Sequence, residues 1–162
     1  MTSPEELLEF LAKHEIATRT YEHVPVFTVE ESRRFRGDLP GGHCKSLFLK
    51  DRKDGLWLVV TLEHRRVDLK RLGRQLGARK GLSFASAERL MEVLGVRPGA
   101  VTPFAVINDR GSRVNVVLDR GMLELDPLNY HPLTNDRTTA ISPTDLSRFL
   151  VACRHMPTLI DL

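Results

Sequence analysis

Apolar residues recur at helical spacing in four stretches of the chain. A serine N-cap opens three of these stretches, at Ser3, Ser86 and Ser142. A fifth helix, short and polar, is expected after Thr28, and a flexible joint follows over residues 37–42. The four amphipathic helices are expected over residues 3–14, 65–77, 87–94 and 142–153.

Runs of β-branched and aromatic residues predict strands between these helices. Residues 43–50 and 56–62 are apolar runs joined by a polar, glycine-containing turn, which is typical of a β-hairpin. The second run is apolar on both faces, as expected of a central strand. Residues 104–108 and 115–119 are interpreted as a second hairpin, and the tail from His155 is expected to be loosely held. Further strands are expected over residues 17–23, 82–84 and the end of the polar segment 126–141.

The composition limits what such a chain can be. With 162 residues, of which 41% are hydrophobic, it can bury one sizeable core, so we expect a single domain over residues 1–162. A net charge of +3 fits a nucleic-acid or phosphate-bearing partner without requiring one. The acidic N-terminus and the lack of an apolar run near the ~20 residues of a membrane span predict a soluble, cytoplasmic protein.

The cysteines and histidines suggest no metal centre. Cys44 and Cys153 are too few for a disulfide scaffold or a zinc cluster. His43, His64 and His131 lack the short spacings of metal ligands. We therefore expect neither a metal nor a cofactor.

The loop over residues 95–104 has a composition that restricts its shape. It contains two glycines and two prolines and follows a predicted helix that ends at Gly95. Gly99 has no Cβ, so a ligand can approach the main chain there and meet N–H groups. The loop is therefore either an oxyanion- or carbonyl-binding turn or a plain connector that proline stiffens.

Lys45 stands at the open end of the first hairpin strand, beside the flexible joint. It is either a functional cation or a surface lysine that protects a strand edge. Cys44 precedes it, and an adjacent cation lowers a thiol pKa. However, neighbouring strand residues point to opposite faces and no histidine–acid partner is evident, so we do not expect Cys44 to be a nucleophile.

The densest positive charge lies over residues 65–80. Apolar positions at helical spacing place the basic groups on the outer face of a helix and in the turn after Gly77. Such a face is either simply solvated or a phosphate-contacting surface. The residues expected to make such phosphate contacts are Arg71, Arg74, Arg79 and Lys80.

Three motifs in a fixed order carry a family resemblance. They are Lys-Ser-Leu-Phe-Leu-Lys at residues 45–50, the loop at 95–104, and Asn-Tyr-His-Pro-Leu-Thr-Asn at 129–135 with Thr138 and Thr139 following. Together they resemble the YbaK and prolyl-tRNA-synthetase editing-domain family over about residues 21–150. Within that family the chain is most similar to the free-standing branch that deacylates alanyl-tRNA(Pro).

The resemblance implies a fold and a reaction. The fold is mixed α/β, with a central, barrel-like mixed sheet surrounded by helices. The reaction is hydrolysis of the ester between a mischarged amino acid and tRNA, without a metal or a covalent enzyme intermediate. Lys45 would position the terminal nucleotide, main-chain amides at Gly99 and Ala100 would hold the substrate carbonyl, and a ribose hydroxyl of the tRNA would help to activate water. His131 occupies the position of a pocket histidine.

Other residues are expected around the substrate. The family lysine is often followed by asparagine or threonine, whereas this chain has Ser46. Tyr21 and His23, at the end of the first strand, either line the pocket or are ordinary strand-end residues. The full set of expected substrate contacts is Tyr21, His23, Ser46, Thr102, Phe104, Asn135 and Thr138.

The resemblance also implies partners and leaves alternatives open. The expected partner is mischarged tRNA(Pro), with prolyl-tRNA synthetase or an elongation factor as a helper and a monomeric enzyme. A hydrophobic pocket discriminates between two amino acids that differ by one methylene by only about 1–3 kcal/mol. A synthetase that admits the smaller alanine therefore needs a second, smaller site that hydrolyses the mischarged product. The alternatives are a deacylase for cysteinyl-tRNA(Pro) or seryl-tRNA, and a non-catalytic module that binds tRNA or a synthetase.

Overall fold

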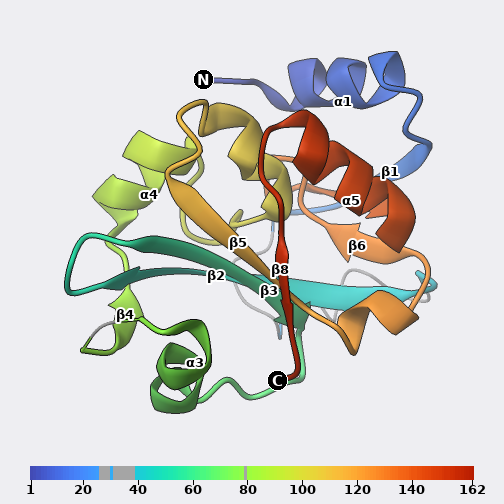
Figure 1. Cartoon of the computed structure of the whole chain (residues 1–162). Coiled ribbons are helices and arrows are strands. Elements are labelled where there is room, and N and C mark those ends of the chain that lie inside the picture. The colour runs from blue at the N-terminus through green and yellow to red at the C-terminus, as the bar shows by residue number, and fades with distance from the viewer. Residues whose placement is uncertain (26–29, 31–38, 79) are drawn as a thin grey trace.

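A computed structural model of the chain describes residues 1–25, 30, 39–78 and 80–162 (Figure 1). The helix expected after Thr28 and the start of the expected joint lie outside these residues. The elements, in chain order, are α1 (Pro4–Lys13), β1 (Thr18–Glu22), β2 (Gly42–Asp51), β3 (Leu56–Leu62), α3 (Leu69–Leu76), β4 (Leu82–Phe84), α4 (Ala87–Leu94), the 3₁₀ helix η1 (Pro103–Asn108), β5 (Val114–Asp119), the 3₁₀ helix η2 (Met122–Glu124), β6 (Leu128–Tyr130), β7 (Arg137–Ile141), α5 (Pro143–Ala152) and β8 (Thr158–Ile160).

The described strands form one eight-stranded mixed sheet in the order β1-β7-β6-β2-β3-β5-β8, with β4 paired to β2. The expected hairpin of β2 and β3 is confirmed, and β3 lies between β2 and β5 as its two apolar faces predict. The pairs β2–β6, β3–β5 and β5–β8 are parallel, whereas the others are antiparallel. The mixed α/β fold is therefore confirmed, with β1 and β8 at the open ends of the sheet.

Helices cover both faces of the sheet (Figure 1). Helices α1, α4 and α5 and the 3₁₀ helix η1 contribute to the larger apolar core on one face, where Phe104 and Phe149 are fully buried. Helix α3 covers the other face through Leu72, which packs with Leu49, Val59 and Val117. Burial of these side chains on two faces explains why β3 is apolar throughout.

The predicted hairpin of residues 104–108 and 115–119 is wrong. The Thr102 hydroxyl accepts a hydrogen bond from the Phe104 amide at 3.3 Å, so Thr102 is an N-cap. With Pro103 at the first helical position, residues 103–108 form the 3₁₀ helix η1 and not a strand. Strand β5 pairs with β3 in parallel, from Leu56 opposite Val114 onward. The apolar run of η1 reflects burial on all sides, which periodicity alone does not distinguish from a buried strand.

The expectation of a loose tail is also wrong. Strand β8 extends the sheet by pairing with β5, and His155 is only 4% exposed. The His155 ring lies 2.8 Å from an Asp109 carboxylate oxygen. The polar segment after residue 126 likewise contains β6 in addition to the expected strand β7.

Candidate functional site

The loop after α4 is held by its own main-chain hydrogen bonds. Gly95 adopts a left-handed conformation with φ +66° and caps the helix, as its sequence position predicts. Gly99 has φ +93°, a conformation that favours glycine. The Ala100 amide donates to the Arg97 carbonyl at 3.0 Å, which closes a turn.

This turn changes the expected set of carbonyl-binding amides. The Ala100 N–H is already used by Arg97, so the role expected of it is taken by an internal bond. Within the described part of the chain, the amides of Gly99 and Val101 donate to no protein acceptor. These two amides are the candidates for binding a substrate oxygen.

A small cavity lies where the ends of β2 and β3 meet β6, β7 and this loop. Its volume is about 30 Å³, compared with about 620 Å³ for a larger groove lined by the same two loops. Three expected site residues, Ser46, His131 and Thr138, line it together with Val101 of the loop. The complete lining is His43, Cys44, Ser46, Glu63, Val101, Asn129, Tyr130, His131 and Thr138.

His131 enters this cavity in a defined protonation state. Its Nδ1 lies 2.9 Å from the carbonyl oxygen of Arg137, which can only accept, so Nδ1 carries a proton. Burial lowers the pKa of His131 from its ordinary value of 6.5, the Arg137 carbonyl opposes this, and the nearby His23 adds to it. The neutral ring therefore has a bare Nε2 that can accept a hydrogen bond.

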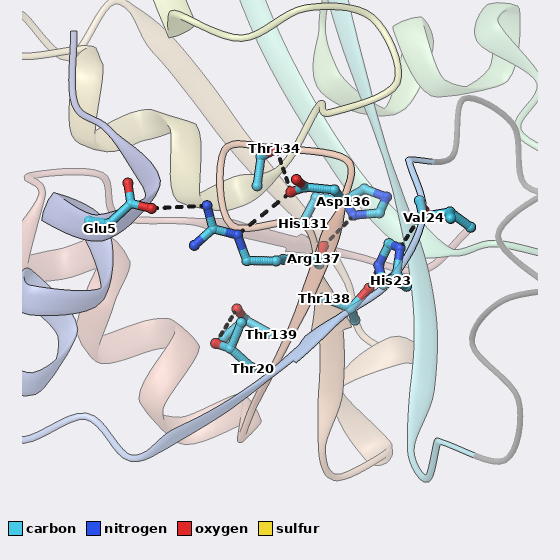
Figure 2. A network of polar contacts seen from close by, with 10 residues as sticks. All are labelled: Glu5, Thr20, His23, Val24, His131, Thr134, Asp136, Arg137, Thr138 and Thr139. Atoms are coloured by element: carbon cyan, nitrogen blue, oxygen red, sulfur yellow. Dashed lines mark hydrogen bonds and ion pairs between the residues drawn. The ribbon is translucent and has the colours of Figure 1, made fainter.

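His23 and Thr138 form a second polar pair beside His131 (Figure 2). The Nδ1 atom of His23 lies 2.8 Å from the Val24 carbonyl, so it is the donor there. In the neutral ring Nε2 then accepts the Thr138 hydroxyl at 2.8 Å. The rings of His23 and His131 are 6.1 Å apart between centroids.

Tyr21 lies on β1, which ends one residue before His23, and does not line the cavity. It is opposite Thr138 in the β1–β7 register, and the Arg19 guanidinium lies 5.9 Å from the centre of its ring. The structure therefore brings His23, through Thr138, closer to the cavity than Tyr21.

The loop between β6 and β7 is fixed by a polar network (Figure 2). The Thr134 hydroxyl donates to Asp136 at 2.8 Å, and the Arg137 guanidinium lies 3.6 Å from the same carboxylate. Arg137 also reaches back to Glu5 of α1 at 3.0 Å. Because the Arg137 carbonyl orients His131, this network positions the histidine.

Two expected residues line the larger groove rather than the cavity. Ala100 and Asn135 are found there, beside Leu133 and Thr134. The loop 95–102 and the loop after β6 each contribute residues to both hollows, which share no lining residue among those that the structure describes.

Thr102 and Phe104 have structural roles in the described chain. Both are 0% exposed. Thr102 caps η1, and the Phe104 ring packs edge-on against Tyr130 and Phe149 at 6.0 and 5.3 Å. The expected contact of these two residues with substrate stays a prediction.

Lys45 does not line the cavity. Its ammonium group donates to the carbonyl oxygen of Arg65, and its register partner on β3 is Thr61. Alternation along β2 places Cys44 and Ser46 toward the cavity and Lys45 on the opposite face of the strand. Lys45 and the loop residue Val101 therefore do not share this cavity.

Several residues that line the cavity were not predicted as site residues from the sequence. Cys44 lines the cavity, yet burial raises its thiol pKa to about 12, so the thiol stays protonated at neutral pH. Asn129 and Glu63 also line the cavity although neither was expected to contact substrate. The alternation of β2 is the signal that could have identified Cys44, and Asn129 stands first in the third motif.

The expected tRNA-contacting residues lie on and after α3, apart from the cavity. Arg71, Arg74 and Lys80 are exposed, whereas Arg79 lies outside the described residues. Helix α3 is shorter than expected because Asp68 caps it by accepting the amides of Lys70 and Arg71.

The residues before α3 turn inward. Arg65 pairs with the buried Asp119 at 3.0 Å and therefore does not join the exposed basic surface. Among the described residues, no group of three or more histidine, cysteine or acidic side chains is placed to hold a metal ion. None of the described helices is long and apolar enough to cross a membrane.

Comparisons with known proteins agree on the family. Residues 23–149 match the model of the aminoacyl-tRNA editing domain. The prolyl-tRNA synthetase associated domain-containing protein 1 of Danio rerio is 41% identical over 158 residues, which cover 96% of this chain and 85% of that protein. The prolyl-tRNA editing protein ProX of Acetoanaerobium sticklandii is 38% identical over 132 residues, covering 81% of this chain and 80% of that protein.

A solved structure supports the fold independently. It is that of a proposed trans-editing enzyme for prolyl tRNA synthetase, with a TM-score of 0.76 at 19% identity, and covers 100% of this chain and 98% of that one. With the family model spanning residues 23–149, the chain belongs to the aminoacyl-tRNA editing domain family.

Proposed function

We propose that this chain deacylates mischarged alanyl-tRNA(Pro) in trans. The observation that carries the proposal is the small cavity that Ser46, Val101, His131 and Thr138 line in a member of the editing-domain family. The names of the relatives, which refer to prolyl-tRNA editing and to prolyl-tRNA synthetase, support tRNA(Pro) as the substrate.

The chemistry needs positioning more than a strong nucleophile. An aminoacyl ester is already activated, so holding a water molecule and stabilising the developing oxyanion with fixed donors lowers the barrier. The amides of Gly99 and Val101 are the donors that the loop offers. Water attacks the ester carbonyl, a ribose hydroxyl of the tRNA assists, and the amino acid and tRNA leave. The protonated Cys44 thiol takes no part.

Lys45 contacts the terminal nucleotide from outside the cavity in this proposal. Its ammonium lies on the face of β2 toward Arg65, at the start of the basic segment. Burial lowers its pKa from the ordinary value of 10.5. A phosphate or sugar oxygen would replace the Arg65 carbonyl as its acceptor, so Lys45→Ala should raise KM for tRNA and Lys45→Arg should restore part of the loss.

The exposed basic residues of α3 extend the RNA-binding surface. Arg71 and Arg74 project from the outer face of the helix, and Lys80 follows it. Phosphate neutralisation by such groups supplies affinity without sequence selectivity. The acceptor end would then run from this surface to the cavity.

Cavity size gives the proposed selectivity. In this proposal the methyl group of alanine enters the small cavity, whereas the larger proline ring meets Val101 and Tyr130 of its wall. A size difference alone separates substrates by about 1–3 kcal/mol per methylene, or roughly 10–200-fold.

The test offers alanyl-, cysteinyl-, seryl- and prolyl-tRNA(Pro) to the pure protein. The proposal predicts rapid loss of alanine and slow loss of proline. Rapid loss of cysteine or serine with alanine untouched would assign the other substrate. Loss of none of the four, with tRNA still bound, would identify a non-catalytic binding module.

A further inference from the structure

Two oxygen atoms around the cavity are buried and have no hydrogen-bond partner within the described part of the chain. They are Ser46 Oγ and Asn129 Oδ1, and both residues line the cavity. Asn129 as a whole is only 4% exposed. Buried polar atoms are normally paired, so two orphans beside one cavity indicate that a ligand group pairs with them.

The orientation of the Asn129 amide is fixed by its other end. Its Nδ2 donates to the carbonyl oxygens of Pro40 at 3.0 Å and Gly42 at 3.1 Å. Since both of these acceptors require the NH₂ group, the remaining atom is the carbonyl Oδ1, which can only accept. The ligand group facing it must therefore be a donor.

The acceptors of the cavity wall point to a donor with several N–H groups. Glu63 contributes a carboxylate to the lining, and the neutral His131 has an acceptor at Nε2. The nearest lysine along β2, Lys45, is turned away toward Arg65. The wall is thus rich in hydrogen-bond acceptors, which suits a small ammonium group with its several N–H donors.

We propose that this wall binds the α-ammonium group of the aminoacyl moiety. One N–H is accepted by Asn129 Oδ1 and a second by Ser46 Oγ. The ester carbonyl, two bonds from the ammonium nitrogen, then lies near the loop that contributes Val101 to the same cavity. This inference rests on the proposed function, and it makes Ser46 a selectivity residue for a free amine.

The first experiment compares alanyl-tRNA(Pro) with lactyl-tRNA(Pro), in which a hydroxyl replaces the ammonium. Wild type is expected to hydrolyse the alanyl ester at least about tenfold better in kcat/KM, since hydrogen bonds to charged groups are the strong ones. Ser46→Ala is expected to lose about tenfold on the alanyl ester and less than about twofold on the lactyl ester. Ser83→Ala, a serine change in the exposed strand β4, is the matched control. Equal losses on both esters, or no loss on either, would overturn the assignment.

The second experiment needs no hydrolysis. Calorimetry measures binding of adenosine carrying an amide-linked alanyl or lactyl group at its 3′ position. The ammonium site predicts about tenfold tighter binding of the alanyl amide to wild type and a smaller difference in Ser46→Ala. If wild type hydrolyses neither ester but retains this preference, the deacylase proposal fails and the ammonium site stands. Equal binding of the two amides, or binding of neither, rejects the site itself.

Discussion

His131 is the cavity residue whose proton positions follow most directly from its contacts. The Arg137 carbonyl fixes the proton on Nδ1, and burial keeps the ring neutral. The Arg137 side chain is in turn tied to Glu5, at 3.0 Å on helix α1. The orientation of one histidine therefore depends on a contact that spans most of the chain.

The lowered pKa of His131 has a consequence for stability. The unfolded chain takes up this proton near the ordinary pKa of 6.5, whereas the folded chain resists it. The free energy of unfolding therefore falls as pH drops below 6.5, until the folded ring is also protonated. His131→Asn retains a donor for the Arg137 carbonyl but does not titrate, so it should lose less stability between pH 8 and pH 5. Urea unfolding across this range checks the prediction, and parallel curves for the two proteins would contradict it.

Cys44 provides a second residue-scale prediction. Burial raises its pKa to about 12, so at neutral pH the thiolate is scarce. Cys44→Ala should keep kcat on alanyl-tRNA(Pro) within about threefold of wild type, with about 1 kcal/mol lost in stability for the missing sulfur. Single-turnover hydrolysis measures the rate. A loss of about a thousandfold would instead identify a covalent mechanism.

The residue scale also shows what sequence could not predict. Lys45 stands in a family motif, which marks it as important without saying where its side chain points. Alternation along β2 separates Lys45 from Ser46, but which of the two faces the cavity depends on the partner strands. The packing of β2 against its partner strands decides which side chain faces the cavity. The sequence therefore identified β2 as part of the site but did not identify which of its faces lines the cavity.

At the scale of elements, a buried carboxylate ties the C-terminal part to the sheet. Asp109 accepts the amides of Arg113 at 3.2 Å and Val114 at 2.8 Å, in addition to the His155 ring. The other nitrogen of His155 contacts the Cys153 carbonyl at 2.7 Å. This cluster joins the end of η1, the start of β5 and the end of α5.

Asp109→Ala should therefore destabilise the protein strongly. It leaves two amides and a buried imidazole without their acceptor, and breaking a buried pair typically costs about 3–5 kcal/mol. Arg120→Ala is the control, because the Arg120–Asp161 pair also ties the C-terminal segment but is exposed, and such pairs contribute about 0–1 kcal/mol. Urea unfolding of both variants gives the comparison. Similar losses in the free energy of unfolding for the two variants would show that the buried cluster stabilises the protein no more than the exposed pair does.

Local signals predicted the elements well where capping and periodicity agreed. Ser3, Ser86 and Ser142 all cap helices as expected. The errors fall where burial is complete or pairing is distant. Helix η1 reads as a strand because all its sides are apolar, and β8 has only three residues whose pairing with β5 is not visible locally.

At the scale of the whole molecule, strand β2 contacts both the basic helix α3 and the cavity: Leu49 packs with Leu72 of α3, whereas Cys44 and Ser46 line the cavity. Helix α3 covers one face of the sheet, whereas the cavity opens among the ends of β2, β3, β6 and β7. A tRNA acceptor end that reaches the cavity would thus have a cationic surface to follow. Each of the three sequence motifs contributes a residue to the cavity, namely Ser46, Val101 and His131. The sequence did not indicate that the basic segment lies on another part of the molecule.

Charge reversal on α3 tests that surface. Arg71→Glu with Arg74→Glu should weaken binding to all tRNAs alike and reduce the slope of log affinity against log salt by about 2, because each phosphate contact contributes about 0.7–0.9. Lys13→Glu with Lys53→Glu, which reverses two exposed lysines elsewhere, should change both quantities less. Filter binding over a range of salt concentrations measures them. An unchanged slope in the α3 variant would mean that the helix face is only solvated.

The central claim is that the aminoacyl group of alanyl-tRNA(Pro) occupies the cavity beside Val101 and His131. The most direct measurement is the single-turnover rate of alanyl-tRNA(Pro) deacylation by wild type and by Val101→Leu, which adds a methylene to the cavity wall. The account predicts fast hydrolysis by wild type and a loss of about tenfold or more in the variant at unchanged tRNA affinity. Equal rates for the two proteins would contradict it.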